Sequence, residues 1–153
     1  MTEQGSAWDR LLAREQEKEE ERLAIIRRHA EAGVVFFDLK TAYICPEAEI
    51  GAGTEIGAGV VIEGATRIGS GCRIGHHSRI ADSILGNGVE MEQSIVLRSE
   101  VGDRSKIGPF AYLRPGCRIV SHDFDMAGVR PKQVVDMGNH TVYLWETPLQ
   151  FEK

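Results

Sequence analysis

The 153-residue sequence predicts an all-β solenoid: a parallel β-helix built from six-residue repeats and preceded by an α-helix. Two observations predict this class. An aliphatic residue recurs about every six positions, and the chain holds 17 glycines while aromatic residues make up only 7%. A helix requires apolar spacing near 3.6 residues and an ordinary strand one of about 2. A period of six fits a short strand followed by a corner, where glycine and small side chains relieve the turn.

The repeats run through residues 44–119 and predict three apolar columns. Three strand-and-corner units close one coil, so every third repeat should stack above its equivalent in the coil below. We therefore predict a β-helix domain over residues 34–120. The predicted columns are Ile44, Ile62, Ile80, Val96 and Leu113; Ile50, Ile68, Leu85, Val101 and Ile119; and Ile56, Ile74, Met91 and Ile107.

Residues 1–33 are expected to form an N-terminal helix that covers the open end of the first coil. Ser6 and Asp9 fit a capping box at its start, and Gly33 fits a stop signal at its end. Residues 14–22 are wholly polar, which indicates a solvated stretch. We expect Leu23, Ile26 and Ala30 to form a stripe that rests on the first coil.

Composition narrows the range of partners. The net charge is −5, from 18 basic and 23 acidic residues, so no nucleic-acid partner is expected. No segment is apolar and long enough for a membrane span and no signal peptide is evident, so we expect a cytoplasmic protein.

After the repeats, residues 121–153 are predicted to be an irregular tail with a strand or hairpin near residues 141–145, which are rich in β-forming residues.

Four phrases carry a resemblance to a known family. They are RRHAEAGV from Arg27, TAYICPEAEIGAGTEIG from Thr41, IADSILGNGVE from Ile80 and IGPFAYLRPG from Ile107. They resemble the first part of the hexapeptide-repeat domain of the bacterial bifunctional N-acetylglucosamine-1-phosphate uridylyltransferase/glucosamine-1-phosphate acetyltransferases. The resemblance implies a left-handed β-helix, a homotrimer and a place in UDP-N-acetylglucosamine biosynthesis. The 153 residues show no counterpart of the family's nucleotidyltransferase domain, so we do not expect uridylyl transfer from them.

The resemblance also implies candidate site residues. In that family the arginine of the Leu-Arg-Pro-Gly phrase binds the sugar phosphate, and Arg114 matches it. Lys132 matches a second phosphate-binding residue by its distance along the chain. His140, three residues before Tyr143, matches the family's catalytic histidine and its neighbouring tyrosine. The implied ligands are a sugar phosphate or UDP-sugar, with acetyl-CoA as co-substrate.

Each candidate has a plainer alternative. Arg114 is equally compatible with a solvated arginine whose stem packs beside Tyr112, and His140 with a chance match in a surface strand. His76 and His77 lie in a corner without a third ligand nearby, so no metal site is expected.

Three functions remain open: a transferase-related protein with a sugar-phosphate subsite, a non-catalytic trimeric scaffold, and a small hexapeptide-repeat acyltransferase that uses His140 between subunits.

Overall fold

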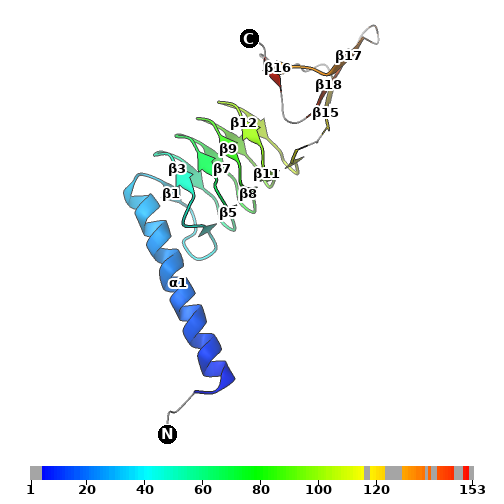
Figure 1. Cartoon of the computed structure of the whole chain (residues 1–153). Coiled ribbons are helices and arrows are strands. Elements are labelled where there is room, and N and C mark those ends of the chain that lie inside the picture. The colour runs from blue at the N-terminus through cyan, green and yellow to red at the C-terminus, as the bar shows by residue number, and fades with distance from the viewer. Residues whose placement is uncertain are drawn as a thin grey trace.

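The structure is a computed structural model in which a long helix leads into a stack of triangular coils (Figure 1). It describes residues 5–115, 118–122, 129–136, 138, 141–146 and 150–151, and the side chains of residues 5–115, 130–136 and 138. Helix α1 spans Ala7–Glu31, and short strands follow it through the rest of the chain.

The solenoid strands form three parallel sheets, which we call the β1, β2 and β3 faces after their first strands. The β1 face holds β1 (Val35–Phe36), β4 (Glu55–Ile56), β7 (Arg73–Ile74), β10 (Glu90–Met91) and β13 (Lys106–Ile107). The β2 face holds β2 (Tyr43–Ile44), β5 (Val61–Glu63), β8 (Arg79–Ala81), β11 (Ile95–Leu97) and β14 (Tyr112–Leu113). The β3 face holds β3 (Glu49–Ile50), β6 (Arg67–Ile68), β9 (Ile84–Leu85) and β12 (Glu100–Val101).

Strand register confirms the predicted fold class and, with one exception, the predicted columns. Ile44 pairs with Ile62, Ile62 with Ile80, and the column continues through Val96 to Leu113. The other two faces repeat this arrangement from Ile50 to Val101 and from Ile56 to Ile107. Most of these side chains are buried and together form one continuous core. The five-residue steps keep this register because they shorten corners and leave the strands intact.

The exception is Ile119, which does not continue the second column. It lies in β15 (Arg118–His122), which pairs antiparallel with β18 (Thr141–Glu146), and the backbone register pairs Ile119 with Trp145. β18 also pairs with β17 (Gln133–Asp136), and β16 (Val129–Arg130) pairs with β19 (Gln150–Phe151). Parallel pairing therefore ends at Leu113 of β14, earlier than the predicted boundary at residue 120. The six-residue spacing persists to Ile119, but β18 supplies the backbone partners that a further coil would have supplied.

Buried hydroxyls join consecutive coils at the corners. Thr54 is fully buried, and its Oγ1 donates to the carbonyl of Gly69 at 2.8 Å and accepts the backbone N–H of Cys72 at 3.1 Å. The Ser94 hydroxyl accepts the N–H of Ala111 in the same way at 3.0 Å. The small polar residues that the repeat places at corners therefore bond one coil to the next, in addition to leaving room for the turn.

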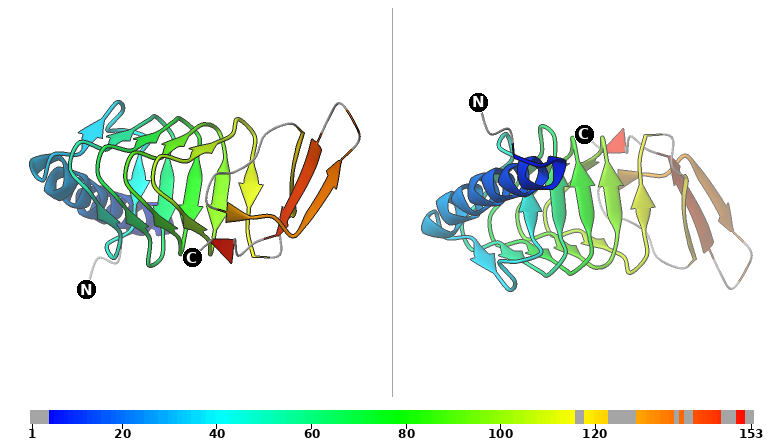
Figure 2. Two further views of the ribbon diagram at one scale, coloured as in Figure 1. Left: turned by 90° about the horizontal axis from the view of Figure 1, so that it is seen from above. Right: turned by 90° about the horizontal axis from the view of Figure 1, so that it is seen from below.

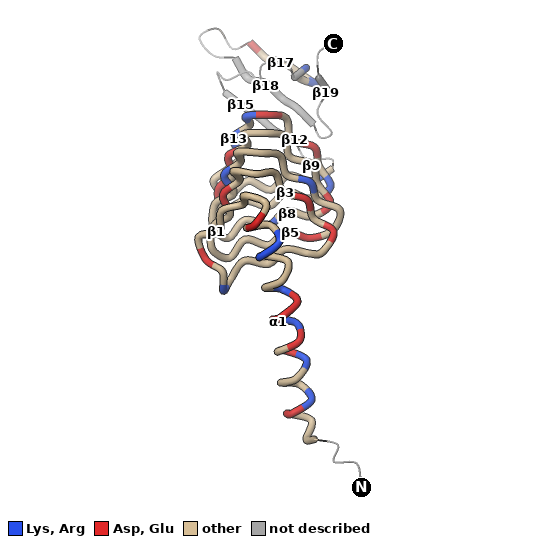
Figure 3. Tube along the Cα trace, turned by 90° about the vertical axis from the view of Figure 1, so that its left-hand side faces the viewer, with Lys and Arg blue, Asp and Glu red and all other residues tan. Residues whose placement is uncertain are grey.

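Helix α1 packs on the first coil through its C-terminal third, and the rest of it projects away from the coils (Figure 1). Figure 2 shows the helix at the first-coil end of the stack. The capping box of Ser6 and Asp9 is present, and Gly33 follows the last turn at a φ of 98°. Acidic and basic residues alternate along the projecting part (Figure 3). Within the described part of the chain, no helix has the length and apolar character needed to cross a membrane.

The contact face of α1 differs from the predicted stripe. Ile26 and His29 are buried, whereas Leu23 and Ala30 are exposed. One turn before Ile26, Arg22 donates through its Nη1 atom to the carbonyls of Leu39 and Ala42 at 2.8 and 2.7 Å. The prediction for Ile26 is confirmed, but it is wrong for Leu23 and Ala30, because these hydrogen bonds turn the Arg22, Ile26 and His29 side of the helix toward the coil.

Replacement of Thr54 by valine tests the corner hydroxyls. Thr54→Val keeps the volume but leaves the buried N–H of Cys72 without its acceptor, so we expect the free energy of unfolding to fall by about 1–3 kcal/mol. Thr54→Ser keeps the hydroxyl and should lose only about 1 kcal/mol, for the missing methyl group. Chemical denaturation measures both. A valine variant as stable as the wild type would show that the hydroxyl contributes nothing to coil stacking.

The buried His29 predicts a pH dependence of stability. Burial lowers the pKa of His29 below its ordinary value, and the Arg28 guanidinium acts in the same direction. The unfolded chain therefore binds the proton more tightly, so the stabilisation is present above the unfolded pKa of about 6.5 and is lost as pH falls toward the folded pKa. We expect the melting temperature to drop more steeply between pH 7.5 and 5.5 for the wild type than for His29→Gln. The variant His76→Gln, which removes an exposed imidazole, is the control; equal slopes for His29→Gln and the wild type would contradict the assignment.

Candidate functional site

A groove of about 690 Å³ runs along the outside of the β1 face. Its floor is made by the outward side chains that precede each core residue, and its wall by the corner that leads toward the β2 face. Phe37 lies at its first-coil end. The other outward and corner residues that line it include Glu55, Gly57, Arg73, Gly75, His76, Glu90, Glu92, Lys106 and Gly108.

Bare backbone forms part of the groove wall because the coils approach too closely for side chains there. A Cβ atom on Gly57 would lie 2.7 Å from the backbone nitrogen of His76, and one on Gly75 would lie 2.7 Å from the carbonyl oxygen of Met91. Both contacts are with backbone atoms of the next coil, which cannot move aside. The stacking distance between coils therefore dictates glycine at these positions.

Four of the five charged side chains that line the groove form two ion pairs with one another. Arg73 Nε lies 3.1 Å from Glu55 Oε2, and Lys106 Nζ lies 3.5 Å from Glu90 Oε2. Such exposed pairs contribute less than about 1 kcal/mol each to stability. Pairing nevertheless neutralises the floor of the groove, so these residues offer no surplus of positive charge to an anionic ligand. Nor do the described residues of the chain include a group of three side chains that could hold a metal ion.

Arg114, the predicted phosphate-binding residue, lies directly after β14 at the last coil of the β2 face. Its side chain is exposed, and its Cζ atom lies 5.8 Å from the centroid of the Tyr112 ring. A guanidinium over an aromatic face at this distance gains a cation–π attraction. The contact agrees with the alternative, in which the stem packs beside Tyr112, and it also holds the charged group on the outside, where a ligand would meet it.

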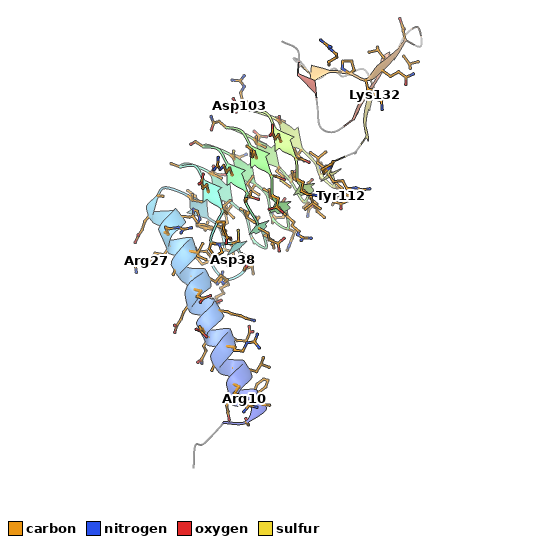
Figure 4. All side chains as sticks on the ribbon, viewed as in Figure 1. Arg10, Arg27, Asp38, Asp103, Tyr112 and Lys132 are labelled. Atoms are coloured by element: carbon orange, nitrogen blue, oxygen red, sulfur yellow. The ribbon has the colours of Figure 1, made fainter. Side chains whose placement is uncertain are left out.

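The other predicted site residues lie in the C-terminal segment. Lys132 is exposed between β16 and β17, and Figure 4 shows it on a different part of the molecule from Tyr112. The backbone of Tyr143 lies in β18, opposite Val134. The Tyr143 side chain and the whole of His140 lie outside the described residues. A cluster of Arg114, Lys132, His140 and Tyr143 therefore stays a prediction.

Sequence reasoning missed the groove on the β1 face. The signal was present in the residue that precedes each core residue on that face, because Glu55, Arg73, Glu90 and Lys106 alternate in charge. Residues that are more than a dozen positions apart become neighbours only once coils are stacked. The Tyr112 contact of Arg114, by contrast, agrees with the alternative stated from the sequence, in which the arginine stem packs beside Tyr112.

Comparison with known proteins agrees with the geometry. Residues 47–82 match the family described as bacterial transferase hexapeptide (six repeats). The bifunctional protein GlmU of Alkaliphilus metalliredigens is 41% identical over 118 residues, which cover 77% of this chain and 25% of that protein. GlmU of Clostridium novyi is 43% identical over 98 residues, covering 64% and 22%. GlmU of Carboxydothermus hydrogenoformans is 46% identical over 101 residues, covering 63% and 23%.

These matches place the solenoid inside the shared segment. The chain spans about a quarter of the length of the curated relatives that it matches. Any stretch of 118 residues in a chain of 153 includes residues 36–118, so the stacked coils and Arg114 fall within the segment shared with the Alkaliphilus protein. Residues 47–82 thus match bacterial transferase hexapeptide repeats, and the chain is similar to one part of the bifunctional GlmU proteins.

Proposed function

We propose that this chain is a transferase-related protein of amino-sugar nucleotide metabolism that acts in the cytoplasm and binds a sugar phosphate at Arg114. The observation that carries the proposal is the position of Arg114, which lies in the segment shared with GlmU and presents an exposed guanidinium at the last coil. A planar guanidinium can donate two parallel hydrogen bonds to a phosphate. Contact with Tyr112 restricts its side-chain rotamers and so lowers the ordering cost of binding.

Acetyl transfer is the reaction that this site would serve. The amine nitrogen of glucosamine-1-phosphate would form an amide bond with the acetyl carbon of acetyl-CoA, and the carbon–sulfur bond would break. In the proposed arrangement His140 accepts the amine proton as a general base and returns it to the departing thiolate, with Tyr143 contacting the substrate. Lys132 would supply the second positive charge near the phosphate.

The proposal includes a homotrimer. A solenoid of this length exposes much surface for its volume, and its flat faces are suited to docking against equivalent faces. Subunits that pack side by side would also extend a ligand site beyond what one short solenoid offers. A complete site in this proposal therefore draws residues from neighbouring copies.

A second candidate function is a non-catalytic trimeric scaffold. The observation that favours it is the separation of the groove, which lies on the β1 face, from Arg114, which follows the last strand of the β2 face. In this alternative the arginine stabilises the last coil through Tyr112 and binds nothing. A small acyltransferase that uses His140 toward another acceptor is the third candidate.

One assay separates these candidates. The purified full chain is incubated with acetyl-CoA and glucosamine-1-phosphate, and N-acetylglucosamine-1-phosphate is measured by mass spectrometry. Product formation supports the transferase. Binding of the sugar phosphate without product supports a retained subsite, while neither product nor binding supports the scaffold. Acetylation of a different amine from a panel of acceptors would support the third candidate.

The role of Arg114 is tested by titration calorimetry with glucosamine-1-phosphate and UDP-N-acetylglucosamine. Arg114→Ala should weaken binding by about 10- to 100-fold, because hydrogen bonds to a charged group contribute about 1.5–3 kcal/mol. Arg67→Ala removes an exposed arginine of the β3 face and should leave affinity unchanged. Absence of heat with either ligand at millimolar concentration, or equal affinity in Arg114→Ala and the wild type, would rule out the subsite.

A further inference from the structure

The groove on the β1 face has the dimensions of a ligand site but takes no part in the proposed function. Its volume of about 690 Å³ lies within the range of small-molecule sites. It begins at Phe37 beside β1 and crosses β4, β7, β10 and β13, whereas Arg114 follows β14 on the β2 face. A ligand in this groove would therefore be distinct from the sugar phosphate proposed at Arg114.

The floor of the groove presents hydrogen-bond donors and acceptors that balance in charge. The side chains of its two ion pairs, Glu55 with Arg73 and Glu90 with Lys106, each remain at least 37% exposed. Arg73 Nε donates to one oxygen of Glu55, Oε2, at 3.1 Å, which leaves the other carboxylate oxygen able to accept from a ligand. A strongly anionic ligand gains nothing from this floor, and an apolar ligand would strip water from its charges. A neutral ligand rich in hydroxyl groups fits, because each hydroxyl both donates and accepts.

An aromatic ring lies at the first-coil end of the groove. Phe37 is 69% exposed, and its N–H donates to the carbonyl of Ile56 at 3.0 Å, which holds its backbone beside the groove. Gly57 and Gly75 occupy the equivalent position in the next two coils, so no side chain of theirs stands between the ring and the rest of the groove. A pyranose ring suits this arrangement, because it has a face of C–H bonds that packs on an aromatic ring and a rim of hydroxyl groups.

The spacing of the floor distinguishes a saccharide from a peptide. Its charged residues recur once per coil, at the distance between neighbouring strands of a sheet, about 4.8 Å. An extended peptide advances about 3.3 Å per residue and falls out of step with such a ladder. One pyranose unit of an extended β-1,4-linked glycan advances by nearly the coil spacing, so successive units meet equivalent positions of the floor.

We propose that the groove of the β1 face binds a neutral, extended oligosaccharide. Phe37 stacks on one pyranose ring, and the two ion pairs of the floor exchange hydrogen bonds with the hydroxyl groups of the following units. Glu92, which lines the groove and forms no ion pair among the described residues, accepts from a further hydroxyl at the corner. The proposal goes beyond the proposed function and does not depend on it.

Titration calorimetry of the full chain with cellotriose, a neutral β-1,4-linked trisaccharide, tests the proposal. Maltotriose, its α-1,4-linked isomer, is the matched control, because it has the same hydroxyl groups on a curved chain. We expect cellotriose to bind more tightly than maltotriose. Its affinity should be the same at low and high salt, because the ligand carries no charge to be screened.

Phe37→Ala tests the stacking contact. We expect it to weaken cellotriose binding by about 2- to 10-fold, through loss of the aromatic face. Trp8→Ala removes an aromatic side chain of similar exposure, 63%, from the first turn of α1 and should leave the affinity unchanged. Circular dichroism checks that both variants fold.

Paired substitutions test the floor. Glu55→Leu together with Arg73→Leu keeps the charge balance but removes the hydrogen-bonding groups, and should weaken binding by about 10-fold or more. Glu55→Gln together with Arg73→Gln keeps donors and acceptors and should retain most of the affinity. The control is the same leucine pair at Glu49 and Arg67, which form the corresponding ion pair on the β3 face at 3.4 Å. It should bind cellotriose as the wild type does.

The outcomes separate this groove from the site proposed at Arg114. Absence of cellotriose binding by the wild type, or equal affinity for cellotriose and maltotriose, would overturn the proposal. So would wild-type affinity in both Phe37→Ala and the leucine pair at Glu55 and Arg73. Arg114→Ala should bind cellotriose normally, and its failure to do so would place the saccharide at Arg114 instead. Loss of glucosamine-1-phosphate binding alone would contradict the proposed function and leave this groove assigned.

Discussion

The structure depends on the parallel pairing of each coil with the next. Strands of two or three residues cannot form stable hydrogen-bonded structure within one coil, so their N–H and C=O groups find partners only above and below. The core has the same requirement, because Ile62 is enclosed only when Ile44 and Ile80 lie in register on either side. Backbone bonding and apolar burial thus impose one and the same register on all three faces.

This pairing explains the corners. Non-glycine residues such as His77 and Phe110 adopt the left-handed region, with φ of 57° and 62°. At these corners the N–H of His77 donates to the carbonyl of Ala58, and that of Phe110 to the carbonyl of Gln93, in the coil below. The hydrogen bond to the previous coil offsets the conformational cost of a left-handed side-chain residue. Glycine is therefore one solution at a corner, while Gly57 and Gly75 are required where the next backbone is too close.

At each end of the stack, the backbone N–H and C=O groups and the apolar core need partners that a further coil would have supplied. At the first coil this is done by α1, through buried Ile26 and the Arg22 hydrogen bonds to Leu39 and Ala42. Parallel pairing ends at Leu113, and the next strand, β15, takes an antiparallel partner. Arg114 lies at this transition, directly after β14. The candidate ligand site and the change of architecture therefore occupy the same point of the chain.

The sequence by itself determined the solenoid and, apart from Ile119, its three apolar columns, because the period of six can be read from each short repeat. It also determined the capping box of Ser6 and Asp9, which requires only two residues three positions apart. Only the tertiary structure decided which side of α1 meets the coil, because the angle at which the helix crosses the first coil puts Arg22 and His29 on the contact side. The end of the column before Ile119 was decided in the same way, because β18, a strand distant in sequence, provides the pairing partner of β15. The groove was not predicted, although it is lined by residues such as Glu55 and Arg73, which lie more than a dozen positions apart in the sequence and become neighbours through stacking.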